Sequence, residues 1–220
     1  MANIVFDLDG TLVDSLPGIE FSLQLAIEQN FRGRMTGNLR DRIGPPIGKI
    51  IKLILPKATE AESTAVEEAF RRIYDERGYR STNAYPYLLE SLSFLKENGF
   101  HLYILTNKPA KATNLIVDFL GIAKYFKGIV CLDSNGEKRF ENKQAAAVFC
   151  ATKFSLNADS TWLVGDSLDD AMAAKSCGWR FISACYGYGG VEKEVSVLPD
   201  HRIHSLNELE AFFATTEKMV

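Results

Sequence analysis

Five short apolar runs lie at wide intervals along the chain, and each is long enough to form a buried strand. They span residues 3–6, 101–105, 128–132, 162–164 and 180–184. Segments with a helical spacing of apolar residues lie between the later runs, for example residues 143–153. Strands that alternate with helices are typical of βαβ units, so the pattern predicts a doubly wound α/β domain with a parallel sheet.

The stretch after the first run has a different pattern. Ser15 is placed to cap a helix over residues 16–30, with Pro17 in the first turn, where proline is tolerated. Glycine and proline interrupt residues 32–57, which indicates short helices joined by tight turns. We expect no strand between residues 15 and 98.

Two further helix starts are indicated by capping-box sequences. Thr59 and Glu62 have this spacing and open a helix that ends at Gly78, while Ser205 and Glu208 open a C-terminal helix.

The length and composition fit an α/β domain with a modest second unit. The chain has 220 residues, of which 46% are apolar and 24% are charged, an ordinary balance for a globular protein. Because the all-helical stretch lies between the first two predicted strands, residues 16–80 are expected to form an inserted helical domain, and residues 1–15 and 81–220 the core domain.

Charge and hydropathy argue against several classes of protein. The net charge is −3 and no basic cluster is present, so a nucleic-acid partner is not expected. No apolar run approaches the roughly 18 residues of a membrane span, and Asp7 and Asp9 fall where the apolar part of a signal peptide would lie. The four cysteines form no CxxC pair, so we expect reduced thiols in a cytoplasmic protein.

Polar side chains follow three of the predicted strands where each strand ends. Asp7 and Asp9 end the first run, Thr106 the second and Asp166 the fourth. Ligands of open α/β sheets bind beyond the carboxyl ends of the strands. Carboxylates gathered there repel one another, and Mg²⁺, which prefers oxygen ligands and accepts a substrate phosphate, relieves the repulsion. We therefore expect Asp7 and Asp166 to hold Mg²⁺.

Three motifs resemble those of the haloacid dehalogenase superfamily. They are Asp7-Leu-Asp9-Gly10-Thr11-Leu12-Val13-Asp14, Leu105-Thr106-Asn107 and Gly165-Asp166-Ser167-Leu168-Asp169-Asp170. Their order and separation are similar to motifs I, II and IV of that family, and the insertion after motif I resembles its helical C1-type cap. The resemblance implies a Rossmann-like core.

The resemblance also implies roles for individual residues. Asp7 resembles the nucleophile that becomes an aspartyl-phosphate, and Asp9 the general acid/base, whose backbone carbonyl joins Asp7 and Asp166 around Mg²⁺. Asp170 is counted with Asp7, Asp9 and Asp166 as a metal-site residue, and is expected to orient a metal water or the active-site lysine. Thr106 is expected to bind the phosphoryl oxygens. Gly10 and Asn107 complete the phosphate-binding set.

The lysine of motif III is the least defined part of the resemblance, because the usual Lys-Pro pair is absent. Lys143, which lies 23 positions before Asp166, has a spacing similar to that of the family, and Lys138 and Lys153 are the alternatives. Its ammonium group is expected to neutralise Asp7 and the phosphate. Every other lysine is expected to be a solvated surface charge.

Substrate selection is expected to involve the cap. Arg42, Gly44 and Ile47 lie where cap residues of the family often face the substrate, although packing within the cap explains them equally well. Asp9, which dehalogenases of the family lack, argues against carbon–halogen cleavage. Tyr85-Pro86 and Gly187-Tyr-Gly resemble the phosphoglycolate phosphatase branch.

We therefore expect a Mg²⁺-dependent phosphatase that acts on a small phosphorylated metabolite and is a monomer or homodimer. A phosphosugar mutase or pyrophosphatase of the same family is the alternative, and a non-catalytic phospholigand-binding protein is the alternative from another class.

Overall fold

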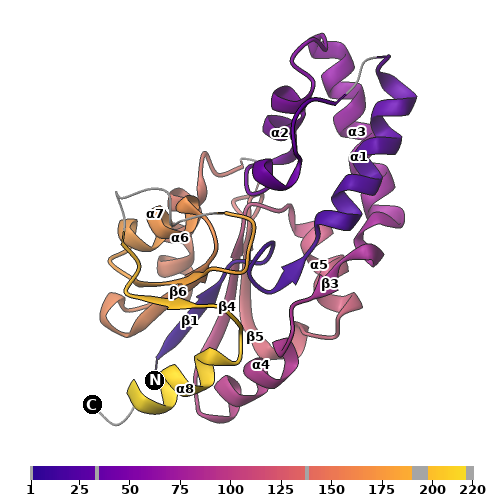
Figure 1. Ribbon diagram of the computed structural model, residues 1–220. Coiled ribbons are helices and arrows are strands. Elements are labelled where there is room, and N and C mark those ends of the chain that lie inside the picture. The colour runs from indigo at the N-terminus through magenta and orange to yellow at the C-terminus, as the bar shows by residue number, and fades with distance from the viewer. Residues whose placement is uncertain (1, 33–34, 137–138, 190–197, 217–220) are drawn as a thin grey trace.

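The computed structural model describes residues 2–32, 35–136, 139–189 and 198–216. Its centre is a six-stranded sheet in the order β5-β4-β1-β6-β7-β8, and all neighbouring strands are parallel (Figure 1). The strands are β1 (Asn3–Phe6), β4 (His101–Thr106), β5 (Phe126–Cys131), β6 (Thr161–Gly165), β7 (Arg180–Ala184) and β8 (His201–Ile203). The predicted parallel α/β fold is confirmed.

The sheet separates two apolar layers, because successive residues of a strand point to opposite faces. On one face Ile4 and Phe6 pack with α4, α5 and α8, and on the other face Val5 and Leu163 pack with α6 and α7. The bounds of these helices are α4 (Leu88–Glu97), α5 (Ala110–Phe119), α6 (Lys143–Phe154), α7 (Leu168–Ser176) and α8 (Glu208–Thr216).

Three more helices form a group that stands beyond one end of the sheet in Figure 1. They are α1 (Leu16–Asn30), α2 (Ile47–Ile54) and α3 (Glu60–Glu76). The chain enters and leaves this group through a two-stranded antiparallel pair, β2 (Val13–Asp14) and β3 (Asn83–Ala84). We propose that this pair is the junction between a core domain and an inserted cap. The expectation of no strand between residues 15 and 98 was wrong, because β3 pairs with a partner far away in the sequence.

The helix starts differ in part from those predicted. The capping box of Thr59 and Glu62 is present at the start of α3. The helix predicted over residues 16–30 is confirmed as α1 with Ser15 at its N-cap position, but the Ser15 hydroxyl donates to Asp9 and makes no capping hydrogen bond. The capping box at Ser205 is also wrong, since α8 begins only at Glu208 and that carboxylate accepts the backbone N–H of His204 at 3.2 Å.

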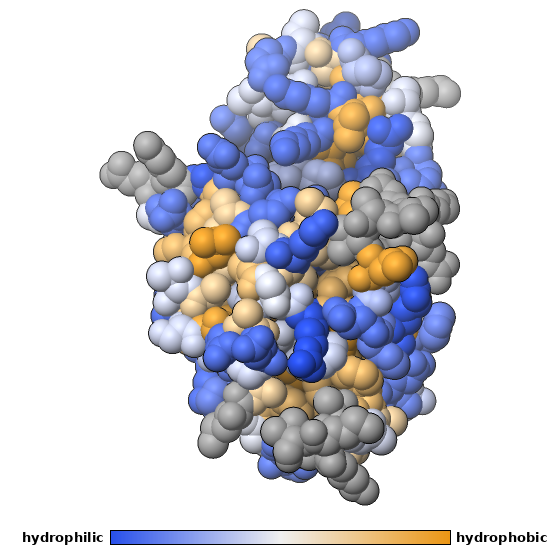
Figure 2. Space-filling view, turned by 90° about the vertical axis from the view of Figure 1, so that its left-hand side faces the viewer, coloured by the Kyte–Doolittle hydropathy of each residue, from blue (hydrophilic) through white to orange (hydrophobic). Residues whose placement is uncertain are grey.

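The surface in Figure 2 carries its strongly hydrophobic residues in small groups separated by polar ones. Within the part of the chain that the structure describes, no helix combines the length and the apolar character needed to cross a bilayer.

Candidate active site

A cavity of about 260 Å³ lies between the carboxyl ends of the central strands and the helices α1–α3. Its walls include residues from β1, β4 and β6 together with residues from the inserted segment. The candidate residues that line it are Asp7, Asp9, Gly44, Ile47, Thr106, Asn107, Lys143, Asp166 and Ser167. The structure therefore brings most of the predicted site into one space.

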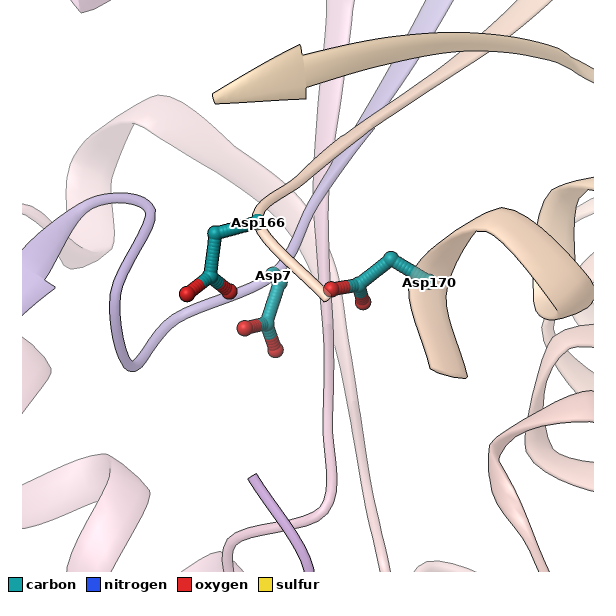
Figure 3. Close-up of side chains that lie close together, drawn as sticks. All are labelled: Asp7, Asp166 and Asp170. Carbon is teal, nitrogen blue, oxygen red and sulfur yellow. The ribbon is translucent and has the colours of Figure 1, made fainter. Parts of the chain in front are cut away.

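Three buried carboxylates lie close together (Figure 3), and two of them, Asp7 and Asp166, line this cavity. Asp7 follows β1, Asp166 follows β6, and Asp170 lies in the first turn of α7. One oxygen from each lies within 4.8 Å of the others. Such a set of hard oxygen donors suits Mg²⁺, which binds carboxylates and retains positions for water and phosphate.

The crowding of these carboxylates changes their proton affinity. Burial raises the pKa of Asp7 well above its usual value, Lys143 opposes the rise, and Asp170 and Asp166 add to it. Burial likewise raises the pKa of Asp166 to about 7, with a further contribution from Asp170. A cation in this space would favour the ionised forms.

Lys143 is the positively charged side chain that contacts two of these carboxylates. It is the first residue of α6, its side chain is 3% exposed, and its Nζ lies 2.5 Å from Asp7 Oδ1 and 2.5 Å from Asp170 Oδ1. Burial alone would lower the pKa of Lys143, but Asp170 and Asp7 raise it above its usual value. This contact supports Lys143 as the motif III lysine. Lys138 lies outside the described residues, and Lys153 lies over the rings of Phe149 and Phe154.

Asp166 is held by the backbone of a following loop. Its Oδ2 accepts the N–H groups of Tyr188 at 2.6 Å and Gly189 at 2.9 Å. On its other side lies Gly10, at a φ of 88°, where an added Cβ would approach Asp166 Oδ2 to 2.3 Å. The N–H of Gly10 donates to Val13 at 2.8 Å, so this residue makes room for the carboxylate rather than donating to a phosphate.

Asp170 has partners for both carboxylate oxygens. Besides the ion pair with Lys143, its Oδ2 accepts the Ser167 N–H at 3.0 Å and the Ser167 hydroxyl at 2.6 Å. Ser167 and Asp170 form the capping box of α7, which sequence reasoning missed. This arrangement favours Asp170 as the residue that orients Lys143, rather than as a direct metal ligand.

Asp9 is paired with a second lysine. Both of its carboxylate oxygens contact Lys108 Nζ, at 3.0 Å and 3.2 Å, and Oδ1 also accepts the Ser15 hydroxyl. The expectation that Lys108 is a solvated surface charge was wrong, because its side chain is only 9% exposed and lies over the ring of Tyr74 in α3. Burial alone would lower the pKa of Lys108, but Asp9 and Tyr74 raise it above its usual value.

The loop after β4 joins the core to the inserted segment. Thr106 Oγ accepts the N–H of Lys108 at 3.1 Å, which leaves the threonine hydroxyl free to donate to a ligand. Asn107 Nδ2 donates to the carbonyl of Gly44 at 3.1 Å. Arg42 does not line this cavity, and its guanidinium contacts the carbonyl of Leu53 at 3.5 Å within the inserted segment.

Lys108 and the segment of Tyr188 and Gly189 were not predicted as parts of the site, although both have a recognisable position in the sequence. Lys108 follows Thr106 by two residues at a strand end, the same relation that singled out Asp9 after Asp7. Tyr188 and Gly189 lie in the glycine-rich segment after β7. Their contact with Asp166 depends on backbone geometry that the sequence does not reveal.

Comparison with known proteins matches most of the chain to hydrolases. The family described as haloacid dehalogenase-like hydrolase matches residues 1–178. A phosphoglycolate phosphatase of Vibrio parahaemolyticus is 31% identical over 214 residues, covering 94% of this chain and 93% of the relative. A phosphoglycolate phosphatase of Nitrosococcus oceani is 30% identical over 216 residues, covering 94% of each.

Solved structures agree with these sequence matches. A structure described as a predicted phosphatase from Clostridium acetobutylicum superposes with a TM-score of 0.84 at 25% identity, covering 97% of this chain and 98% of that one. A structure described as a predicted phosphoglycolate phosphatase from Haemophilus somnus gives the same TM-score, identity and coverage.

Proposed function

Because the chain belongs to the haloacid dehalogenase-like hydrolase family, we propose that its cavity hydrolyses small phosphate monoesters with the help of Mg²⁺. The chain is a phosphoric monoester hydrolase, as its matches to phosphatases over nearly the whole length indicate. The observation that carries the mechanism is the buried contact of Asp7 with Lys143 beside Asp166. Phosphoglycolate is the first substrate to test, because the relatives are phosphoglycolate phosphatases.

Asp7 is the proposed nucleophile. Lys143 holds Oδ1, so we assign Oδ2 to the attack on phosphorus, which forms an aspartyl-phosphate as the bond to the leaving oxygen breaks. Lys143 offsets part of the negative charge that gathers in this buried space. When bound by Asp7, Asp166 and the Asp9 carbonyl, Mg²⁺ would supply further positive charge to the phosphoryl oxygens.

Asp9 is the proposed acid and base. It lies two residues beyond Asp7, lines the same cavity, and would protonate the leaving oxygen opposite the attacking group. It would then take a proton from the water that hydrolyses the aspartyl-phosphate. Thr106 would donate its hydroxyl to a phosphoryl oxygen and so hold the group in line.

We also propose that the protein acts in the cytoplasm on a soluble metabolite. All four cysteines are free thiols, which fits a reducing compartment.

The test is turnover of p-nitrophenyl phosphate and phosphoglycolate with and without Mg²⁺, in the wild type and in Asp7→Asn. We expect metal-dependent release of phosphate by the wild type and a loss of at least about 1000-fold in the variant, as for removal of other nucleophiles. Asp118→Asn, an exposed change on α5, is the control and should retain full activity. Substantial turnover by Asp7→Asn, or none by the wild type, would refute the proposal.

A second measurement identifies the intermediate. Rapid quenching with a phosphate-labelled substrate should leave label on the wild-type chain that hydroxylamine removes, and none on Asp7→Asn. One phosphate released per substrate consumed distinguishes hydrolysis from a mutase, which would return the phosphoryl group to a sugar.

A further inference from the structure

Lys108 is a buried cation located between the acid/base residue and the inserted helices. Its Nζ contacts both oxygens of Asp9 and lies 4.9 Å from the ring centroid of Tyr74. Among the described residues, Asp9 is its only ion-pair partner. A buried ammonium group is costly unless it is paired. Asp9 supplies that pair, and the position of Lys108 in the cavity leaves open whether it also binds the substrate.

The location of Lys108 relates it to the leaving group of the substrate. In an in-line transfer the attacking oxygen of Asp7 and the leaving oxygen lie on opposite sides of phosphorus. The leaving oxygen must lie near Asp9, which protonates it. The rest of the leaving group therefore extends from Asp9 toward the inserted helices, past the ammonium group of Lys108.

Much of the wall on that side of the cavity is apolar. It includes Ile43, Pro45, Pro46, Ile47, Ile50 and Phe70, none of which has a side-chain hydrogen-bond donor, and the polar side chains beside them are Arg71, Tyr74 and Asp75 of α3. A sugar placed against the apolar residues would leave hydroxyl groups without partners. A compact leaving group with one anionic end would pack against the apolar residues and form an ion pair with Lys108 at the same time.

Other cations that line the cavity are less suited to this role. Arg71 donates twice to Glu67, its neighbour in α3. Lys111 pairs with Asp75 and is 76% exposed, and Arg139 is exposed. Lys143 serves Asp7 on the opposite side of the phosphoryl position.

We propose that Lys108 binds a second anionic group, carried by the leaving group of the substrate, and thereby selects compact phosphorylated acids over phosphorylated sugars. The proposal rests on the proposed function, since the attack by Asp7 and the protonation by Asp9 place the leaving group. One ammonium group can contact Asp9 and a ligand carboxylate at once, because it has three donor protons.

The test compares two substrates of the same shape. Phosphoglycolate carries a carboxylate where isobutyl phosphate carries an isopropyl group. We expect wild-type kcat/KM to favour phosphoglycolate by roughly 10- to 100-fold, which corresponds to one hydrogen bond to a charged group. Glucose 6-phosphate should be a poorer substrate than phosphoglycolate.

Lys108→Met removes the charge and keeps much of the side-chain volume. The ratio of the two kcat/KM values should fall to about one, with most of the loss in KM for phosphoglycolate. If Lys108 served only to position Asp9, kcat would fall for both substrates and the ratio would stay the same, which overturns the proposal. Lys175→Met, the same change at an exposed position of α7, is the control and should keep the wild-type ratio.

The wild-type comparison does not depend on the folding of any variant. A wild type that hydrolyses both esters without preferring phosphoglycolate overturns the role of Lys108 and leaves the phosphatase activity intact. A wild type that hydrolyses no phosphate monoester in the presence of Mg²⁺ overturns the proposed function as well.

Discussion

Replacing Asp166 by asparagine is expected to stabilise the metal-free protein at pH 8. The pKa of Asp166 is raised from 3.8 to about 7 in the folded chain, chiefly by burial and by the neighbouring Asp170. A group with a raised pKa in the folded state contributes stability that is fully present below its unfolded pKa and is lost as the pH rises through the folded value. At pH 8 the folded protein therefore bears the full cost of ionising Asp166.

The size of this cost follows from the shift. A difference of about three pKa units corresponds to about 4 kcal/mol in the free energy of unfolding. Because neighbouring carboxylates share the effect, we expect Asp166→Asn to gain on the order of 2 to 4 kcal/mol at pH 8 and much less at pH 4. The amide oxygen can still accept the N–H groups of Tyr188 and Gly189, so the loop contact is retained.

Magnesium should offset most or all of the variant's advantage in stability. A ligand at 100 times its dissociation constant stabilises the folded state by about 2.7 kcal/mol. The wild type should gain this amount, while the variant, which lacks one carboxylate ligand, should gain much less. A metal ion bound by Asp7 and Asp166 would then add to Lys143 in offsetting the repulsion among the three buried carboxylates.

Urea unfolding, with EDTA or with saturating Mg²⁺, measures both effects. The fluorescence of Trp162 and Trp179 reports the transition, since both side chains are buried. Asp118→Asn, the exposed change on α5, should match the wild type throughout. A variant less stable than the wild type in EDTA at pH 8 would refute the argument from crowding, and equal stabilisation of both by Mg²⁺ would refute Asp166 as a ligand.

Two further substitutions test the lysine and the cap of α7. Lys143→Met should lower the free energy of unfolding by about 3 to 5 kcal/mol at pH 7 without metal, because Asp7 and Asp170 lose their shared buried counter-ion. A free energy of unfolding within roughly 1 kcal/mol of the wild-type value, measured by urea unfolding, would contradict this prediction. Ser167→Ala should cost about 1 kcal/mol by loss of the capping box, whereas Ser205→Ala should cost little because that box is not formed. Thermal unfolding compares these two variants directly, and an equal loss of stability in both would contradict the predicted difference.

The parts of the fold that sequence could predict are those with a local signal. Each of the five predicted strands contains a short apolar run, and Asp7 and Asp166 directly follow the ends of β1 and β6. By contrast, β2 and β3 have two residues each and are defined only by their pairing, Val13 with Ala84 and Asp14 with Asn83. No periodicity exists in so short a segment, so the sequence alone does not indicate it.

The position of Lys108, two residues after Thr106, places it at the strand end, but its burial does not follow from that position. A lysine after a strand is usually solvated. Its environment is created by Asp9, 99 residues away, and by the ring of Tyr74 from the inserted helices. The same holds for Ser15, whose sequence context indicates a helix cap although its hydroxyl binds Asp9.

The two aspartates of the first motif are close in sequence but have separate counter-ions. Lys143 contacts Asp7 and Lys108 contacts Asp9, each from a distant part of the chain. Two neighbouring carboxylates with one shared cation would compete for it, whereas separate lysines permit one to act on phosphorus and the other on the leaving group. Lys108 follows β4, and Lys143 begins the helix that leads to β6, the two strands that flank β1. The separate roles proposed for the two aspartates therefore depend on the strand order, because the position of β1 between β4 and β6 brings both lysines to the same motif.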